Sequence, residues 1–149
     1  MDSLRAPESS SALVLGLAMA LGCGSGQPEL PHADKLVTIQ QGVYGITTSQ
    51  DDVGDNPVLP MGDFAILVYG DAPPLSVGPN GAPIVPPPLA ETRSDESGFY
   101  QLELDAGRYV FCTSFLRCVW LDVPAGRPVR LDYEYSVGSG WSQGEPVEP

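Results

Sequence analysis

The sequence predicts an all-β protein, built as a seven-stranded antiparallel β-sandwich, and three observations lead to this fold class. The apolar residues fall in short runs that are separated by clusters of Gly, Pro and Asp. Beyond the N-terminal segment, no stretch keeps a helical apolar period over ten or more positions, which disfavours a helical domain. Two of the runs alternate between apolar and polar residues, as strands with one buried face do.

Seven runs have the composition of strands. In chain order they are Leu36–Thr47, Phe64–Tyr69, Leu89–Ser94, Phe99–Leu104, Arg108–Cys112, Arg117–Val123 and Val129–Val137. The run Phe64–Tyr69 is apolar throughout, which predicts a central strand that is covered on both faces.

Alternation indicates which side chains of two strands are buried. In the run Phe99–Leu104, the residues Tyr100, Leu102 and Leu104 share one face. In the last run, apolar residues at 129, 131, 133 and 135 alternate with Arg130, Asp132 and Glu134. Each of these strands is therefore expected to bury one face against the other sheet.

The N-terminal segment predicts export. Residues 12–21 form an apolar run that is too short for a membrane-spanning helix, which needs about 20 residues, but suits a signal-peptide core of roughly 7 to 15. The sequence Ala20-Leu21-Gly22-Cys23 resembles the lipobox of bacterial lipoproteins. That resemblance implies acylation of Cys23, which becomes the N-terminus and attaches the protein to a membrane. In proteobacterial lipoproteins an Asp at the next position often retains the protein at the inner membrane. Because Gly24 stands there, the same resemblance implies the outer membrane.

An alternative cleavage stays open. Ala18-Met19-Ala20 matches an A-x-A signal-peptidase site, and a cut after Ala20 would leave Cys23 as a free thiol in a secreted protein. The predicted organisation is a signal peptide over residues 1–22 and a lipidated cysteine with a flexible tether over 23–35. The β-sandwich domain follows over 36–137, and a flexible tail over 138–149.

The charge balance restricts the partners. The chain has a net charge of −12 and 7 Lys and Arg residues, among which Lys35 is the single lysine. Nucleic-acid binding needs clustered basic side chains, so this class of function is disfavoured. The expected partners are a membrane, through lipid on Cys23, and an envelope protein or a surface glycan.

One segment carries a family resemblance. Residues Thr92–Tyr109 (TRSDESGFYQLELDAGRY) resemble the signature of carboxypeptidase regulatory-like domains and of the related Cna B-type and transthyretin-like (prealbumin-like) modules. The resemblance implies this sandwich fold and a spacer, adhesin-stalk, carbohydrate-binding or enzyme-accessory role. Turn chemistry agrees with it, because Asp95–Gly98 and Asp105–Gly107 have turn composition. We expect the second turn to close a tight hairpin, with positive φ at Gly98 and Gly107.

Cys112 and Cys118 flank the turn between two predicted strands, so a disulfide across that hairpin is expected in an oxidising compartment. Their spacing is not the C-x-x-C of redox motifs, and two thiolates alone lack the further ligands of a zinc site. The predicted role of this pair is structural.

Catalysis and cofactors find little support in the sequence. The single histidine, His32, lies in the predicted tether, and no serine stands in a G-x-S-x-G context, so we predict that the protein is not an enzyme and uses no cofactor. A weak calcium site is a minor hypothesis for the acidic loop residues Asp51, Asp52, Asp55 and Asp63, although their spacing matches no EF-hand.

The Cna B-type resemblance raises one further alternative, an internal isopeptide bond. Lys35, Asp132 and Glu103 would be its members. The sequence disfavours this bond, because Lys35 precedes the first strand and both acidic residues fall on outward faces.

The predicted function is that of a non-catalytic envelope lipoprotein whose β-sandwich binds a protein or acts as a spacer. A carbohydrate or small-ligand module remains the alternative, and it requires a cluster of Trp120, Trp141, Phe115 or Tyr residues on one open face. The proline-rich segment Ala72–Leu89 is expected to pack along a sheet edge, with display of its apolar residues to a partner as the alternative.

Overall fold

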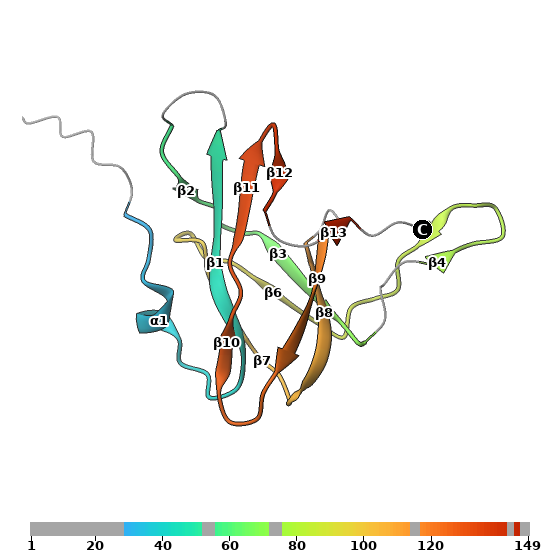
Figure 1. The fold of residues 1–149 in the computed structure, drawn as a ribbon, viewed down its shortest axis with the longest axis horizontal. Coiled ribbons are helices and arrows are strands. Elements are labelled where there is room, and N and C mark those ends of the chain that lie inside the picture. The colour runs from blue at the N-terminus through green and yellow to red at the C-terminus, as the bar shows by residue number, and fades with distance from the viewer. Residues whose placement is uncertain (1–28, 52–55, 72–75, 114–116, 143–144, 147–149) are drawn as a thin grey trace, which may run out of the picture.

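The computed structural model describes residues 29–51, 56–71, 76–113, 117–142 and 145–146. Two β-sheets pack face to face, and a two-stranded hairpin projects from one side of the body (Figure 1). The β-sandwich expected from the sequence is confirmed. The one described helix is far too short to cross a membrane, and no other helix occurs within the described ranges.

The first sheet is built around one long strand, β1 (Gly42–Asp51). Four strands pair with β1: β2 (Leu59–Pro60), β7 (Phe99–Glu103), β10 (Pro128–Arg130) and β11 (Tyr133–Val137). The short strand β12 (Gly140–Trp141) extends this sheet beyond β11.

The second sheet is antiparallel throughout. Its order is β13 (Glu145–Pro146), β9 (Arg117–Val123), β8 (Gly107–Thr113), β3 (Ala65–Tyr69) and β6 (Ala90–Arg93). The strand β3 lies between β8 and β6 and is buried at four of its five positions, which confirms the prediction of a central strand.

The fully antiparallel arrangement expected from the sequence is wrong in the first sheet, where β1 pairs in parallel with β10 and with β11. Alternation indicates which face of a strand is buried but carries no information about the direction of its neighbour. The direction is set instead by the route of the chain, which leaves β9 in the second sheet and crosses to the side of β1.

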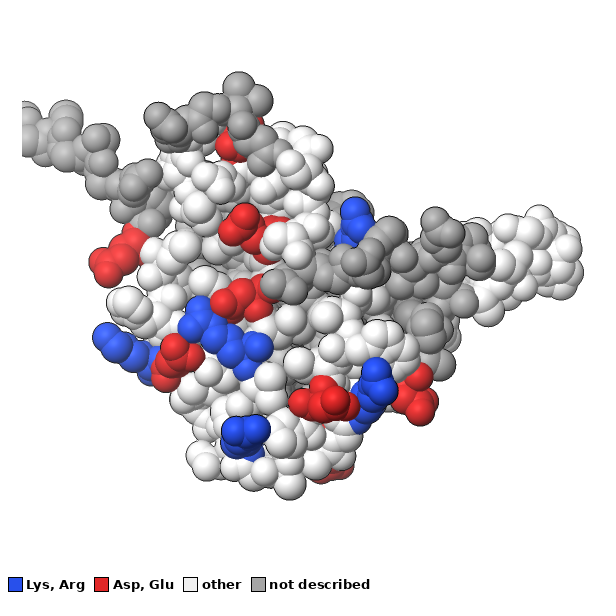
Figure 2. Space-filling model, viewed as in Figure 1, with Lys and Arg blue, Asp and Glu red and all other residues white. Residues whose placement is uncertain are grey.

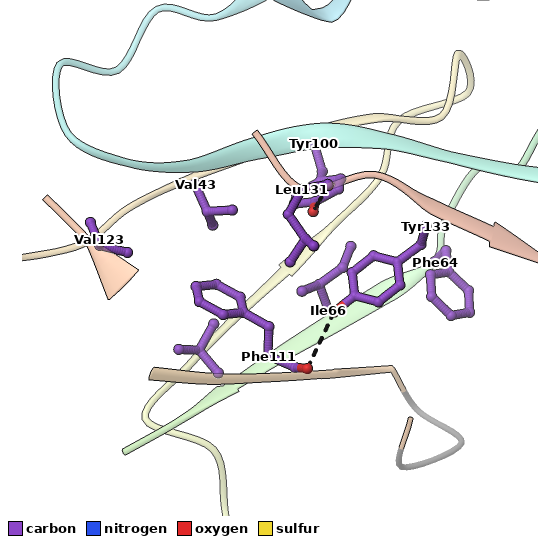
Figure 3. Close-up of a cluster of buried hydrophobic side chains, with 9 residues drawn as sticks. Val43, Phe64, Ile66, Tyr100, Phe111, Val123, Leu131 and Tyr133 are labelled. Carbon is purple, nitrogen blue, oxygen red and sulfur yellow. Dashed lines mark hydrogen bonds between the residues drawn. The ribbon is translucent and has the colours of Figure 1, made fainter. Parts of the chain in front are cut away.

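The core lies between the two sheets and draws on both (Figure 3). Its buried residues are Val43, Phe64, Ile66, Val68, Tyr100, Phe111, Val123, Leu131 and Tyr133. Tyr100, Leu131 and Tyr133 follow the predicted alternation. The Tyr133 hydroxyl donates to the Phe111 carbonyl oxygen at 3.2 Å and so satisfies its polar atom inside the core.

The turn at Asp95–Gly98 carries the chain from the second sheet to the first. The Asp95 carboxylate accepts from the backbone N–H groups of Ser97 (2.8 Å) and Phe99 (3.1 Å), which fixes the turn. Gly98 has φ +82°, as predicted, and a Cβ there would lie 2.5 Å from the Thr47 carbonyl oxygen. Only glycine satisfies both constraints without strain.

The turn at Asp105–Gly107 is not the predicted hairpin. The strand before it, β7, pairs with β1, whereas the strand after it, β8, pairs with β3 and β9. The segment is therefore a crossover between the sheets, closed by a 3.1 Å hydrogen bond from the Tyr109 hydroxyl to the Asp105 carbonyl oxygen. Gly107 is not among the glycines with positive φ.

The last predicted strand is split into β10 and β11. Between them, the backbone N–H of Leu131 donates to the Tyr44 carbonyl oxygen, and the Leu131 carbonyl oxygen accepts from the Tyr100 hydroxyl. The Asp132 carboxylate accepts the N–H of Ile46 at 3.0 Å. One backbone hydrogen bond thus remains at the break, and the Tyr100 and Asp132 side chains supply the other two.

The N-terminal boundary of the domain also differs from the expectation. A single helical turn, α1 (Ala33–Leu36), precedes the sandwich, and β1 begins at Gly42 rather than at Leu36. Ala33 is fully buried, so the end of the segment predicted as a tether is folded onto the domain. At the other end, β12 and β13 place part of the predicted tail in the two sheets.

Candidate functional site

The most prominent surface feature is the projecting hairpin, which we call the arm (residues 76–89). It consists of β4 (Ser76–Val77), β5 (Pro83–Ile84) and the segment that leads back to β6. A tight turn closes it, with Gly81 at φ +74° and the Gly78 N–H donating to the Ala82 carbonyl oxygen at 2.8 Å. Figure 1 places the arm and α1 on opposite sides of the sandwich.

The arm is apolar, exposed and uncharged. Val77 and Ile84 are each 51% exposed, Val85 is 44% exposed, and Leu89 at its base is 70% exposed. No charged residue occurs between positions 76 and 89. The body carries many charges, whereas the arm forms a white projection (Figure 2). The expectation that this proline-rich segment packs along a sheet edge is therefore wrong, because its strands pair with each other instead.

The base of the arm is attached to the sandwich. The Leu89 N–H donates to the Val68 carbonyl oxygen at 2.7 Å, immediately before β6 pairs with β3. An isolated two-stranded hairpin is marginally stable in water, and this hydrogen bond fixes the base of the arm to the sandwich.

A cleft of about 450 Å³ opens where the arm joins the body. Its walls come from four separate segments and consist of Gln41, Leu89, Ala90, Glu103, Leu104, Asp105 and Tyr109. The Gln41 side chain donates to the carbonyl oxygen of Leu104, another wall residue (2.9 Å), and it is fixed further because it accepts from the Gly126 N–H (2.8 Å). The volume lies within the range of small-ligand sites.

The cleft combines apolar walls with two carboxylates. Leu89, Leu104 and the Tyr109 ring supply apolar surface, whereas Glu103 and Asp105 supply negative charge. Its chemistry suits an uncharged or positively charged group rather than an anion. Leu89 belongs to both features, so the arm and the cleft form one continuous surface.

The tryptophans do not form the open aromatic row that a carbohydrate site requires. Trp141 packs into the core, with ring centroids 4.6 Å from Phe64 and 5.0 Å from Tyr135. Trp120 is 41% exposed in the other sheet, where the Arg108 guanidinium lies 4.8 Å from its ring centroid. Phe115 lies outside the described residues.

The predicted disulfide is confirmed. Cys112 and Cys118 are opposite each other in the β8–β9 ladder and are joined through their sulfur atoms. Together with Tyr69 and Val110 they form a second small buried cluster, on the face of the sheet opposite to Phe111. The bond staples the hairpin, as expected for a structural pair.

A polar network fastens the N-terminal segment to the first sheet. The Asp34 carboxylate accepts from the Tyr44 hydroxyl (2.7 Å) and from Arg130 (3.0 Å), and Arg130 also contacts Asp132 at 2.9 Å. The hydrogen bond to Asp34, with burial, raises the pKa of the Tyr44 hydroxyl. Partial burial opposes the charge of Arg130, but Asp132 and Asp34 outweigh it and raise the pKa of the guanidinium. Both raised pKa values therefore favour the protonated Tyr44 hydroxyl and the protonated Arg130 guanidinium, which are the forms that donate these hydrogen bonds.

The calcium hypothesis gains no support. Asp63 forms a 3.1 Å ion pair with Arg93, and Asp51 ends β1, while Asp52 and Asp55 lie outside the described residues. Within the described ranges, no group of three or more His, Cys, Asp or Glu side chains is arranged to hold a metal. Cys23, the predicted lipidation site, also lies outside the described residues.

The residues of the hypothetical isopeptide bond are separated. Asp132 lies beside Ile46, whereas Glu103 pairs in register with Gly42, about 13 Å away along β1. Lys35 is exposed in α1. The three groups therefore lack the shared buried site that this chemistry requires.

Sequence reasoning missed the cleft. Its walls meet only because β7 and β8 belong to different sheets, whereas the composition of the turn between them predicts one hairpin. Tyr109 belongs to the recognised signature, but nothing in the sequence pattern connects Gln41 with it. The exposed apolar residues of the arm were visible in the sequence, whereas their projection was not.

No protein-family model and no curated protein matches the sequence. Among solved structures, the chain is similar to GBS52, the minor pilin of the Gram-positive pathogen Streptococcus agalactiae, with 15% identity and a TM-score of 0.44 over 74% of this chain and 47% of the pilin. The chain thus spans about half the length of that pilin. It is also similar to PA1324 of Pseudomonas aeruginosa, a candidate carbohydrate-binding protein, with 12% identity and a TM-score of 0.46 over 73% of this chain and 99% of that protein. Likenesses this distant are not informative about what the present chain binds.

Proposed function

We propose that this protein is a non-catalytic lipoprotein of the cell envelope that binds another envelope protein through the arm. The observation that carries the proposal is the exposure of Val77, Ile84, Val85 and Leu89 on one uncharged projection. Large apolar side chains that are exposed together on one projection are typical of interaction sites.

The energetics favour a protein partner. Complete burial of one Val, Leu or Ile side chain stabilises by roughly 1.5–3 kcal/mol, so the four partly exposed side chains of the arm leave several kcal/mol to be gained in a complex. No charged group has to be desolvated in the arm. The acidic body, with the chain at a net charge of −12, limits non-specific association.

The proposed attachment rests on the sequence. Lipid on Cys23 would hold the protein at a membrane, with the outer membrane as the proposed location. Figure 1 supports an orientation in which the arm points outward, because α1, which follows the N-terminal segment, lies on the side of the sandwich opposite to the arm. Intact-mass measurement of the membrane fraction, with Cys23→Ser as control, tests the lipid; an unmodified mass in the aqueous fraction would show a secreted protein instead.

The arm is tested by changing its apolar side chains in the full-length protein. In native cells treated with a cross-linker, the wild type is expected to give a discrete larger complex, and Val77→Asn/Ile84→Asn is expected to lose it. Val137→Asn is the matched control, because Val137 is also a strand valine and is 53% exposed, but lies in the first sheet. A complex that survives in the double variant would exclude the arm as the binding surface.

A surface glycan is the second candidate, and exposed Trp120 is the observation that favours it. The Arg108 guanidinium lies over this indole ring; if it turns aside, the ring can stack on a sugar and the guanidinium can donate hydrogen bonds. Binding to a panel of immobilised glycans that disappears in Trp120→Ala, but not in Val77→Asn/Ile84→Asn, would favour this function over the arm.

A further inference from the structure

The segment that returns from the arm to the sandwich is an exposed proline run. Residues 83–89 read PIVPPPL, and all of them except Pro88 are classed as exposed. Pro83 and Ile84 form β5, whereas Val85–Pro88 belong to no strand. This run lies on the outer surface of the arm without a covering element among the described residues.

The backbone of this run is restricted in advance. Each proline ring fixes φ near −65°, and a residue that precedes proline is displaced from the helical region toward extended or polyproline II conformation. Val85, Pro86 and Pro87 all precede a proline. The segment therefore loses little conformational entropy when a partner binds it.

The same prolines exclude recognition by strand addition. Between residues 83 and 89, only Ile84, Val85 and Leu89 carry a backbone N–H, and the Leu89 N–H already donates to Val68 at 2.7 Å. A partner strand needs a regular series of donors along the edge, and this edge cannot supply one. Recognition must therefore use side chains.

The side chains offer a ridge. A polyproline II helix has three residues per turn, so in this conformation Pro86 and Leu89 would share one edge. Both are exposed, and Leu89 has the largest exposed fraction, 70%, among the exposed large hydrophobic residues of the described chain. A Cβ added at Gly70 would lie 3.8 Å from the Leu89 Cδ1, so this side chain lies beside the end of β3.

A protein groove suits this ridge better than a membrane surface. Segments that bind at bilayer interfaces use Trp or Tyr together with Lys or Arg. The arm contains none of these residue types between positions 76 and 89. Prolines and their apolar neighbours instead dock in grooves lined by aromatic side chains.

We propose that residues 85–89, which follow β5, bind as a polyproline II ligand in an aromatic-lined groove of the partner protein, with Pro86 and Leu89 as the inserted side chains. This rests on the proposed function, because it names the chemistry of the partner that the arm binds. The partner is thus a protein with an apolar groove, rather than one with an open sheet edge.

The test uses the full-length protein in native cells, with the photoreactive amino acid benzoylphenylalanine at position 89. A protein adduct is expected from this position and not from position 137. The variant Pro86→Ala/Pro87→Ala removes two proline rings that fix φ. In this variant, the yield of the protein adduct from position 89 is expected to fall roughly tenfold. Pro79→Ala is the matched control, because Pro79 is exposed in the turn of the same arm but outside the ridge, and its adduct should persist.

The outcomes separate the two proposals. An adduct that is insensitive to the double proline variant would overturn the polyproline mode and leave the arm as a protein-binding surface. An adduct with lipid instead of protein, or none from any arm position, would overturn both. Adduct formation at position 89 that also requires the prolines, with the site of attachment in a segment of the partner that is rich in aromatic residues, is the result that supports this mode.

Discussion

The hydroxyl of Tyr133 donates to the carbonyl oxygen of Phe111 at 3.2 Å, and this hydrogen bond joins β11 of the first sheet to β8 of the second (Figure 3). Both residues are fully buried. Tyr133→Phe keeps the ring and removes the bond, so it is expected to lower the free energy of unfolding by about 1 kcal/mol. Urea denaturation checks this. Tyr135→Phe is the control, and equal effects of the two variants would contradict the role of the bond.

The two buried tyrosines predict a loss of stability at alkaline pH. Burial raises the pKa of Tyr100 well above its ordinary value of 10.0, and burial also raises the pKa of Tyr133. Below pH 10 both hydroxyls are protonated in the folded and unfolded states, so they cause no change of stability with pH. Above pH 10 the unfolded chain loses these protons while the folded chain retains them, so the free energy of unfolding falls.

The expected slope is about 1.4 kcal/mol per pH unit for each of these tyrosines, from pH 10 up to the raised pKa in the folded state. Urea denaturation at several values between pH 9 and pH 12 measures it. In Tyr100→Phe/Tyr133→Phe, the free energy of unfolding should fall less steeply above pH 10 than in the wild type, when each protein is compared with its own value at pH 8. If the double variant keeps the wild-type slope, other groups cause the alkaline loss.

Gly98 and Gly81 form a matched pair for separating backbone strain from steric overlap. Both have positive φ, but a Cβ at Gly98 would lie 2.5 Å from the Thr47 carbonyl oxygen, whereas a Cβ at Gly81 would meet nothing within 4 Å. Gly81→Ala is therefore expected to cost only about 1 kcal/mol of unfolding free energy, from the positive φ. Gly98→Ala is expected to cost at least about 2 kcal/mol more. If Gly98→Ala and Gly81→Ala have similar midpoints of thermal unfolding, the Asp95–Gly98 turn shifts to accept the added side chain.

The sequence predicts the strands well because their signals are local. Apolar runs and alternation placed β3, β7 and β9 within a residue or two of their observed ends. The Asp95–Gly98 turn was predictable for the same reason, since its hydrogen bonds and positive φ involve neighbouring residues. The cysteine spacing likewise indicated the disulfide between Cys112 and Cys118.

Pairing partners are not local, and the predictions failed there. The residues around Asp105 have hairpin composition, yet β7 and β8 enter different sheets because β1 and β3 offer the pairing edges. The parallel contacts of β1 depend equally on distant chain segments. The cleft is a consequence of that topology, so its residues carry no shared pattern in the sequence.

The Cys112–Cys118 disulfide closes a loop with a sequence separation of 6. In the chain-entropy model this bond stabilises the fold by about 2 to 2.5 kcal/mol, mainly by restricting the unfolded chain. Cys112→Ala/Cys118→Ala is therefore expected to lower the free energy of unfolding by at least this amount, because two buried sulfur atoms are lost as well. Denaturation with and without reductant checks it. A wild type that is equally stable in both conditions would contradict a stapling role.

The apolar residues of the arm are predicted to contribute little to folding. Ile84 is 51% exposed, whereas Ile66 in β3 is fully buried in the core. Ile84→Asn is therefore expected to change the free energy of unfolding by less than about 0.5 kcal/mol, whereas even the conservative Ile66→Val is expected to cost about 1 kcal/mol. Urea denaturation of the two variants gives the comparison. A large loss in Ile84→Asn would mean that the arm packs on the sandwich in solution, which would remove the basis for assigning its apolar surface to a partner. A negligible loss would show that the apolar side chain of Ile84 is not required for the stability of the fold.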